Sequence, residues 1–323
     1  MDVELERVTY RFRQPITTAY GTLAERDVLV LRLRDDDGNE GLGEAAPLTP
    51  YDGVTLEEAE QAIRAGSGSP QGLAALDIAQ ADLSSRIEGR PIAAARTEQP
   101  ADSIGASAAI GATDRAGAAR EAARAVEAGF GTVKLKVGVG DDAGRVAAVR
   151  AAVGPDVAIR IDANGAWDVD QALAALRSLA PARIELCEEP VHGVAGLAAL
   201  RARLDGEIPI AMDETAREPD ALASGACDLV CLKVAECGGI TRLWAAADTA
   251  RAAGSEVYVG STYDGPIGIA AGLHAAAALG PDIPACGLAT LSLFDDVRDP
   301  FPVGAGRIQV PRGPGLGISW PVE

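Results

Sequence analysis

The strongest constraint on the fold is a regular alternation, beyond residue 103, of short apolar runs with alanine-rich stretches. Short runs rich in Val, Ile and Leu predict buried strands, and the alanine-rich stretches predict helices. We expect strands at about 104–110, 132–137, 157–162, 184–188, 208–212, 228–234, 256–261 and 285–291. We expect helices near 113–128, 141–153, 168–180, 194–204, 217–225, 239–253 and 266–279. Eight strands with seven helices predict an α/β fold, a (β/α)7β modified TIM barrel.

The first hundred residues have a different pattern, which predicts a separate α+β domain. Two alternating stretches over 3–33 and a short one over 41–45 predict an antiparallel meander with a polar turn at 35–39. Helical patterns follow at about 55–65 and 70–88. We therefore place one domain over 1–100 and the barrel over 101–292. The Pro- and Gly-rich tail, 293–323, is expected to return to the first domain and complete it.

The net charge and the apolar pattern exclude two classes of partner. The chain carries 29 Lys and Arg against 47 Asp and Glu, a net charge of −18, so a nucleic acid would meet a repulsive field. The first residues lack the basic and apolar regions of a signal peptide, and no run of about 18 apolar residues could span a membrane. We therefore expect a cytoplasmic protein without a nucleic-acid or membrane partner.

Cysteine and histidine offer little to a catalytic site. Five cysteines cannot all pair and none forms a Cys-x-x-Cys, which favours a reducing compartment and no zinc site. Only His192 and His274 are present, and His274 lies in an apolar helical stretch where a core imidazole is expected. Any proton transfer is therefore expected to depend on lysines or carboxylates.

Charged residues end five consecutive predicted strands. They follow one another at spacings of 20 to 26 residues, close to one βα unit: Lys134 and Lys136, Asp162, Glu188 and Glu189, Asp213 and Glu214, and Lys233. In a (β/α) barrel the carboxyl ends of the strands meet at one rim, where reactive groups lie. We therefore expect these side chains to converge, although period-two alternation alone does not choose Glu188 over Glu189.

The order lysine, acid, acid, acid, lysine points to a cation. Three converging carboxylates repel one another unless a cation lies between them, and all-oxygen ligation suits Mg²⁺ or Mn²⁺. The lysines would stand on opposite sides of the ion, which would lower their pKa from about 10.4 toward the range of a general base. Taken singly, each charge could be a solvated strand end, a turn residue or a helix N-cap; their conjunction in strand order favours a site.

These motifs resemble the enolase superfamily, specifically its muconate-lactonizing-enzyme subgroup. The resemblance rests on Lys134-Leu-Lys136, Asp162-Ala-Asn164, Glu188-Glu-Pro190, Asp213-Glu214 and Lys233. It covers nearly the whole chain, including first strands that end in Gly43-Glu44-Ala45-Ala46-Pro47. It implies that the α+β domain caps the barrel and that Asp162, Glu188 and Asp213 bind Mg²⁺, or Mn²⁺ as a substitute. It also implies that Lys136 is the acid/base at one face and that Lys233 faces it from the other.

The same resemblance implies a small-molecule carboxylate substrate, and an oligomer is possible. We expect six further residues to contact the substrate: Lys134, Arg160, Asn164, Ser261, Tyr20 and Tyr51. The family's shared step removes a proton α to a carboxylate and gives an enediolate. Three outcomes follow in the subgroup: β-hydroxyl elimination by o-succinylbenzoate synthases, epimerisation of dipeptides or N-acylamino acids, and muconate cycloisomerisation.

The last predicted strand favours elimination. The segment 285–297 looks like that of o-succinylbenzoate synthases, and Gly287-Leu288-Ala289 lacks the Asp-x-Asp with which dipeptide epimerases hold the substrate ammonium. Asp264 stands where many subgroup members have Glu, which leaves the substrate less certain. We expect a hydro-lyase, an o-succinylbenzoate synthase of menaquinone biosynthesis, with the epimerase, racemase or cycloisomerase as the alternative.

Two readings from other classes stay open. Gly138-Val-Gly140 after a strand could cradle a dinucleotide phosphate, but the spacing differs from Gly-x-Gly-x-x-Gly and two aspartates follow it. A non-catalytic barrel could serve as a binding module, which a missing lysine or carboxylate would indicate, and none is missing.

Overall fold

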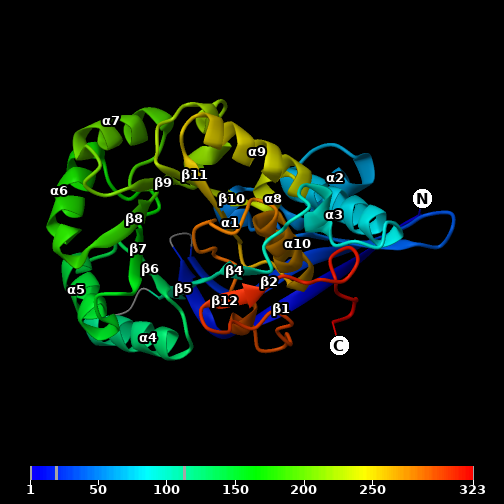
Figure 1. The fold of residues 1–323 in the computed structure, drawn as a ribbon, viewed down its shortest axis with the longest axis horizontal. Helices are drawn as coiled ribbons and strands as arrows, with labels where there is room; N and C mark the ends of the chain where they lie inside the picture. The colour runs from blue at the N-terminus through cyan, green and yellow to red at the C-terminus, as the bar shows by residue number, and fades with distance from the viewer. Residues whose placement is uncertain (1, 19–20, 112–113, 323) are drawn as a thin grey trace.

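A computed structural model describes residues 2–18, 21–111 and 114–322. Seven parallel strands form a curled sheet in the order β11-β10-β9-β8-β7-β6-β5, with helices around its outside (Figure 1). The strands are β5 (Ser107–Ile110), β6 (Thr132–Lys136), β7 (Ala158–Asp162), β8 (Ile184–Glu188), β9 (Ile210–Met212), β10 (Leu229–Lys233) and β11 (Glu256–Gly260). Each lies within a predicted strand range. The predicted α/β barrel architecture is thus observed.

The eighth barrel position differs from the prediction of a strand over 285–291. Only two isolated parallel bridges form there, Ala106 with Cys286 and Gly260 with Gly287. Backbone hydrogen bonds from Ser107 N–H to Cys286 O (3.0 Å) and from Gly287 N–H to Val259 O (2.8 Å) join this segment to both edges of the sheet. Pro284 precedes it and the 3₁₀ turn η5 (Leu291–Leu293) ends it, so the barrel closes through a segment too short to count as a strand.

Six of the predicted helices flank the barrel, and capping aspartates mark where three of them begin. The helices are α4 (Arg115–Glu127), α5 (Asp142–Val153), α6 (Val169–Leu179), α7 (Val194–Leu204), α9 (Ile240–Ala252) and α10 (Pro266–Ala277). The side chains of Asp114, Asp141 and Asp168 accept backbone N–H groups at the starts of α4, α5 and α6. His274 is fully buried in α10, where burial lowers its pKa to about 4, as expected of a neutral core imidazole.

The predicted helix over 217–225 is wrong. Two 3₁₀ turns, η3 (Glu214–Arg217) and η4 (Ala221–Ala223), occupy this region. Pro219 explains the interruption, because a residue before proline is driven out of the helical region, and Glu218 is extended (φ −70°, ψ 146°). A short helix that was not predicted, α8 (Val234–Cys237), follows β10 directly.

The N-terminal residues form the predicted antiparallel meander. It consists of β1 (Asp2–Thr18), β2 (Gly21–Arg34) and β3 (Glu40–Ala45), followed by α1 (Thr49–Asp52), α2 (Leu56–Ala65) and α3 (Pro70–Ile87). Leucines of β2 pack against α3 in a separate buried cluster. The contact is close: a Cβ atom on Gly43 would lie 2.0 Å from the Ala75 carbonyl oxygen, so only glycine fits there.

The tail runs back to the N-terminal residues, as Figure 1 shows. Strand β12 (Arg307–Gln309) pairs with β4 (Ser103–Gly105), which lies just beyond the short turn η1 (Ile92–Ala95). Phe294 stacks on Phe12 of β1 at 4.6 Å between ring centroids, and the Leu316 N–H donates to Asp82 of α3 at 2.7 Å. These contacts place the tail beside β1 and α3. The exact domain limits stay a prediction.

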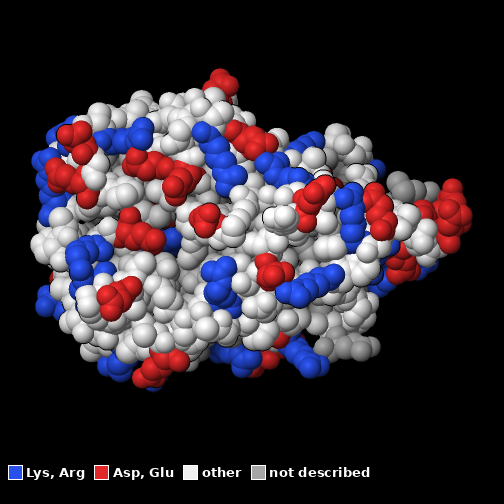
Figure 2. Space-filling model, viewed as in Figure 1, with Lys and Arg blue, Asp and Glu red and all other residues white. Residues whose placement is uncertain are grey.

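The molecular surface carries charges of both signs on the face shown in Figure 2. On this face, acidic and basic side chains are interspersed. Surface ion pairs include Arg34 with Glu40 and Arg177 with Glu207. No helix in the described part of the chain has both the length and the apolar character needed to cross a membrane.

A buried charged cluster connects β2 and β3 to the start of α10. Glu44 accepts the Gly265 N–H at 2.7 Å, and Arg26 donates to the Ala46 carbonyl at 2.5 Å and to the Thr262 carbonyl at 3.1 Å. Burial and the nearby Asp264 carboxylate raise the pKa of Glu44 from 4.5 to about 8. The Glu44 carboxyl group therefore changes its charge within the physiological pH range.

Replacing Glu44 with glutamine is expected to flatten the pH dependence of stability. Because folding raises the pKa of this carboxyl group, its contribution to the free energy of unfolding is fully present below pH 4.5 and is lost as the pH rises through about 8. The slope is at most about 1.36 kcal/mol per pH unit for one group. Urea unfolding of the wild type and of Glu44→Gln between pH 5 and 8 measures this slope.

Glu40 on the same strand supplies the control. Its ion pairs with Arg34 and Arg32 lower its pKa, so it stays ionised across this window and Glu40→Gln should shift stability without changing the slope. A Glu44→Gln variant that keeps the wild-type slope would contradict the assignment of this titration to Glu44.

Candidate active site

The predicted convergence of charges at the barrel rim is present in the structure. Asp162 ends β7, Glu188 ends β8, and the two are paired in register, as are Lys136 and Asp162. Asp213 follows β9, and Lys233 ends β10. The three carboxylate residues are at most 5% exposed. Parallel strands of one barrel thus bring side chains from five sequence segments to one place.

Lys134 lies between two of the carboxylates. Its Nζ atom is 3.0 Å from Asp162 Oδ2 and 2.6 Å from Glu188 Oε1. Lys136 Nζ is 3.1 Å from the same Asp162 oxygen. Lys134 was expected to contact substrate; in this structure it bridges two of the expected metal ligands.

On the opposite side, Lys233 contacts Asp213 and a residue of the N-terminal half. It forms a short ion pair with Asp213 Oδ1 and donates to the Tyr51 hydroxyl at 2.7 Å. The Tyr51 hydroxyl is 3.5 Å from Asp213 Oδ2, and the Arg217 guanidinium lies over its ring at 4.7 Å from the centroid. Helix α1, which carries Tyr51, is therefore fastened to the barrel rim at this point.

The predicted lowering of the lysine pKa values depends on a bound cation and stays a prediction; without an ion, the carboxylates raise the pKa of Lys134 and Lys233. Burial would lower the pKa of Lys134, but Asp162 and Glu188 raise it well above 10.5, and Asp213 does the same for Lys233. Although burial alone would raise the pKa of Asp162, Lys134 and Lys136 lower it. The prediction placed a cation nearest the lysines, whereas their nearest charges here are carboxylates, which favour the ammonium form.

The chemistry of the donor set fits a divalent cation. Asp162, Glu188 and Asp213 supply only oxygen, the ligand type of Mg²⁺, and two of them already surround the positive charge of Lys134. Glu188 is oriented by the Tyr258 hydroxyl, which donates to its Oε2 at 2.5 Å. An ion bound here would compete with the lysine for these oxygens.

The structure separates the roles of Glu188 and Glu189. Glu189 has a left-handed backbone (φ 39°), and its carboxylate accepts the Asp213 N–H at 2.8 Å and the Thr215 N–H at 3.1 Å, with His192 Nδ1 at 3.0 Å. It thereby holds the residues that follow β9, among them Asp213. Glu188 instead faces Lys134 and Tyr258 inside the barrel.

Residues 117–323 match the model of the enolase C-terminal domain-like family. The chain belongs to this family. The resemblance to the enolase superfamily that the motifs indicated is therefore confirmed.

The curated relatives of this chain include o-succinylbenzoate synthases. The chain is 45% identical over 183 residues to that of Mycobacterium ulcerans, covering 53% of this chain and 54% of the relative. It is 41% identical over 216 residues to the o-succinylbenzoate synthase of Thermobifida fusca, a match that covers 63% of this chain and 66% of the relative. The matched region thus spans roughly half to two thirds of these relatives' length.

Solved structures of the superfamily match almost the whole chain. The L-Ala-D/L-Glu epimerase of Bacillus subtilis superimposes with a TM-score of 0.90 at 28% identity, covering 98% of both chains. The muconate lactonizing enzyme of Pseudomonas fluorescens gives 0.88 at 25% identity, covering 100% of this chain and 96% of that one. The modified TIM barrel with its N-terminal antiparallel cap is therefore the fold of this enolase-superfamily chain.

The remaining residues expected to contact substrate lie in different places. Asn164 donates to Glu214 Oε1 at 2.8 Å near the rim, and Ser261 donates to the Gly287 carbonyl at 3.0 Å. Arg160 lies deeper, where its guanidinium donates to Glu185 Oε2 and to the Ala285 carbonyl, each at 2.6 Å. Tyr20 lies outside the described residues. As substrate contacts, all these stay predictions.

Three features of the site were not predicted: the Tyr258 contact with Glu188, the anchoring of β9 by Glu189, and the proximity of Cys231 to the carboxylates. Tyr258 could have been found, because it precedes the strand end Gly260 by two residues and so faces the barrel interior. The predicted alternative of a phosphate loop finds no support, since the Gly138 N–H is taken by Asp142 at 2.7 Å.

Proposed function

We propose that this chain is an o-succinylbenzoate synthase, a hydro-lyase that removes water from 2-succinyl-6-hydroxy-2,4-cyclohexadiene-1-carboxylate. The observation that carries the proposal is the 45% identity to o-succinylbenzoate synthases over 183 residues, against 25–28% to epimerases, racemase and cycloisomerase. The closing segment of the barrel adds support, because Gly287-Leu288-Ala289 has no acidic residue for a substrate ammonium. Five free cysteines support a cytoplasmic location.

Asp162, Glu188 and Asp213 would hold Mg²⁺, or Mn²⁺ in its place. When bound, the ion supplies Lewis-acid stabilisation of negative charge on the substrate carboxylate. Lys136 takes the proton α to that carboxylate, for which it must first give up its own proton. It then holds the transferred proton as an ammonium, on the face from which the β-hydroxyl leaves, and can return it so that the hydroxyl departs as water.

Lys233 stays protonated in this scheme. Asp213 raises its pKa well above 10.5, and its ammonium is buried on the side opposite Lys136. A fixed positive charge there stabilises the enediolate without taking a proton. Dehydration on one face needs only one base, so the arrangement suits elimination.

The proposal is tested with a substrate panel in D₂O with Mg²⁺. The panel contains the cyclohexadiene carboxylate, dipeptides, N-acylamino acids and muconate. We expect an aromatic product from the cyclohexadiene, followed by ultraviolet absorbance and NMR, and slow or no deuterium exchange into the amino-acid derivatives. No aromatic product, with all other substrates inert, would favour the non-catalytic binding module instead.

Epimerisation of a dipeptide is the second candidate, favoured by structural matches over 98% of the chain to the epimerases of Bacillus subtilis and Enterococcus faecalis. An epimerase uses lysines on both faces, so its product carries solvent deuterium with inverted configuration. Efficient incorporation into a dipeptide, without an aromatic product from the cyclohexadiene, would replace the proposed function with this one.

Replacing Tyr51 with phenylalanine is expected to lower kcat/KM about tenfold. The variant keeps the ring under Arg217 but removes the hydroxyl that accepts from Lys233, a hydrogen bond to a charged group worth about 1.5–3 kcal/mol. Steady-state kinetics on the cyclohexadiene carboxylate measure the change. Arg217→Met, which keeps the hydroxyl and removes the stacked guanidinium, is the matched variant; unchanged kcat/KM in Tyr51→Phe would contradict a role for the hydroxyl.

A further inference from the structure

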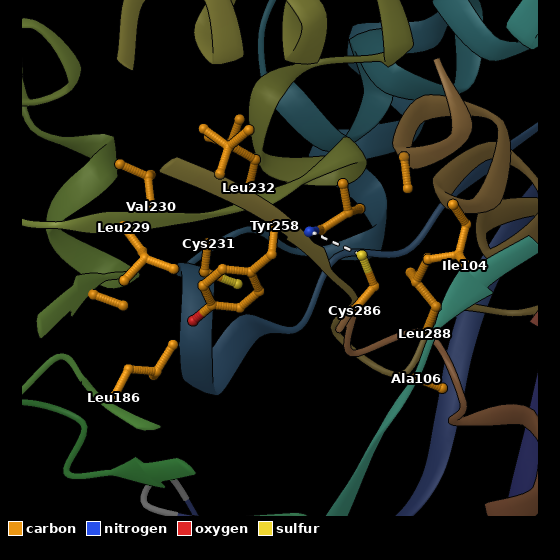
Figure 3. Close-up of a cluster of buried hydrophobic side chains, with 14 of the residues drawn as sticks. Ile104, Ala106, Leu186, Leu229, Val230, Cys231, Leu232, Tyr258, Cys286 and Leu288 are labelled. Carbon is orange, nitrogen blue, oxygen red and sulfur yellow. Dashed lines mark hydrogen bonds between the residues drawn. The ribbon is translucent and has the colours of Figure 1, made fainter. Parts of the chain in front are cut away.

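A thiol lies beside the carboxylates of the candidate metal site. Cys231 is on β10, two residues before Lys233, so both side chains face the barrel interior. Its Sγ atom and one carboxylate oxygen each from Glu188 and Asp213 all lie within 4.8 Å of one another. Figure 3 shows Cys231 next to the Tyr258 ring. These donors come from three strands, β8, the end of β9, and β10.

The Cys231 thiol is buried without a hydrogen-bond partner in the described part of the chain. It is 5% exposed, and it packs so closely on β11 that a Cβ atom on Gly260 would lie 2.9 Å from its sulfur. Other buried thiols have polar neighbours: Cys227 contacts the Ser255 hydroxyl and Cys187 the Glu188 carbonyl. Cys231 is thus an unpaired polar group directed at two carboxylates.

This donor set differs from the all-oxygen set in its preference among metals. Thiolate is a soft ligand that selects zinc-like ions, whereas carboxylates alone suit Mg²⁺ and Mn²⁺. Bond lengths of about 2.3 Å to sulfur and about 2.0–2.2 Å to oxygen put two tetrahedral zinc ligands about 3–4 Å apart. The observed separations of up to 4.8 Å therefore need to close by only about 1 Å.

We propose that Cys231, Glu188 and Asp213 form a second ligand set that binds thiophilic divalent cations, of the zinc and cadmium class, in competition with the Mg²⁺ of the proposed function. On binding, the sulfur–hydrogen bond breaks, a sulfur–metal bond forms and the proton passes to solvent. Because Glu188 and Asp213 belong to both sets, the two ions cannot be bound together. Soft cations therefore inhibit the enzyme by occupying its own carboxylates.

The proposal rests on the proposed metal site but is tested without turnover. The full chain, freed of metal, is titrated with Cd²⁺ or with Mg²⁺, and Kd values are obtained by competition with a chromophoric chelator. Cadmium–thiolate bonds give an ultraviolet charge-transfer band, which reports sulfur ligation directly. We expect this band in the wild type and its loss in Cys231→Ser, with Cd²⁺ affinity at least about tenfold weaker, a loss of about 1.4 kcal/mol, and Mg²⁺ affinity nearly unchanged.

Cys237→Ser is the matched control. Cys237 is the most accessible of the five cysteines, so a band that disappears in this variant and persists in Cys231→Ser would overturn the proposal. Equal weakening of Cd²⁺ and Mg²⁺ in Cys231→Ser would overturn it too, because sulfur would then have no selective role. If Cys231→Ser fails to fold, the ¹¹³Cd NMR shift of the wild type decides between a sulfur-containing and an all-oxygen ligand set.

The two proposals can fail separately. A wild type that does not bind Mg²⁺ but gives the cadmium–thiolate band contradicts the metal site of the proposed function and supports the Cys231 site. A wild type that binds Mg²⁺ but shows no cadmium–thiolate band, and whose ¹¹³Cd shift is that of oxygen ligands alone, supports the Mg²⁺ site of the proposed function. The same result overturns the Cys231 site.

Discussion

Replacing Lys136 with alanine is expected to lower kcat by about 10²–10⁴-fold, the usual contribution of a positioned general base. The chain offers few substitutes for this base. The two histidines are His274, which is fully buried in α10, and His192, whose Nδ1 atom contacts Glu189. Lys134 is fixed between Asp162 and Glu188. Turnover of the cyclohexadiene carboxylate by the purified, Mg²⁺-loaded variant measures the loss.

Lys136→Arg separates proton transfer from charge. Arginine keeps a positive group near Asp162, where Lys136 lies at 3.1 Å, but a guanidinium with a pKa above about 12 cannot serve as a base. We therefore expect this variant to be as inactive as Lys136→Ala while binding Mg²⁺ and unfolding at a similar temperature. Near wild-type turnover in Lys136→Arg would mean that Lys136 supplies charge alone.

Local patterns predicted the barrel well because each strand range is also a buried apolar run. The same runs led to the site, since strand ends at a βα spacing must meet at one rim whatever the sequence between them. Asp162 and Glu188 are adjacent in register for this reason. The metal role of these residues stays a proposal, but their convergence is observed.

Two predictions of secondary structure are wrong, and in both cases the surroundings of the segment override its local sequence pattern. The apolar run over 285–291 was predicted to be a strand, yet it forms single bridges with Ala106 and Gly260. Pro219 interrupts the predicted helix over 217–225, because the residue before a proline is driven out of the helical region, and this outweighs the helical composition of the segment.

Contacts between distant segments were beyond sequence reasoning. Tyr51 and Lys233 are separated by 182 residues, and period and spacing do not report that the hydroxyl meets the ammonium. The choice between Glu188 and Glu189 likewise needed coordinates, because the left-handed backbone of Glu189 directs its carboxylate to the end of β9. The directions of the pKa shifts of Lys134 and Lys233 also needed coordinates, because they depend on which charge is nearest to each ammonium group.

Replacing Asp213 with asparagine is expected to weaken Mg²⁺ binding by more than about 10–100-fold, the range that loss of an outer-shell partner already produces. Turnover should fall with it. The change is nearly isosteric, so it removes one of three carboxylate charges while leaving the Asp213 backbone N–H bonded to Glu189. Isothermal titration with Mg²⁺ gives the affinity, and kinetics at saturating Mg²⁺ give the residual turnover.

Stability must be separated from metal binding in this variant, because Asp213 is also the ion partner of Lys233. Removing one member of a buried ion pair costs about 3–5 kcal/mol, since the other charge is left without a partner. Asp213→Asn combined with Lys233→Met removes both charges and should recover much of the stability, but not Mg²⁺ binding. Recovery of both would show that the single variant lost its metal through a distorted fold.

Glu214→Gln is the matched control for the choice of ligand. Glu214 is the next residue, is buried, and accepts a hydrogen bond from Asn164. We expect it to bind Mg²⁺ at least about tenfold more tightly than Asp213→Asn does, a difference of at least about 1.4 kcal/mol. If Glu214→Gln loses Mg²⁺ while Asp213→Asn keeps it, the third ligand is Glu214. Asp213 would then act only as the counter-ion that keeps Lys233 protonated.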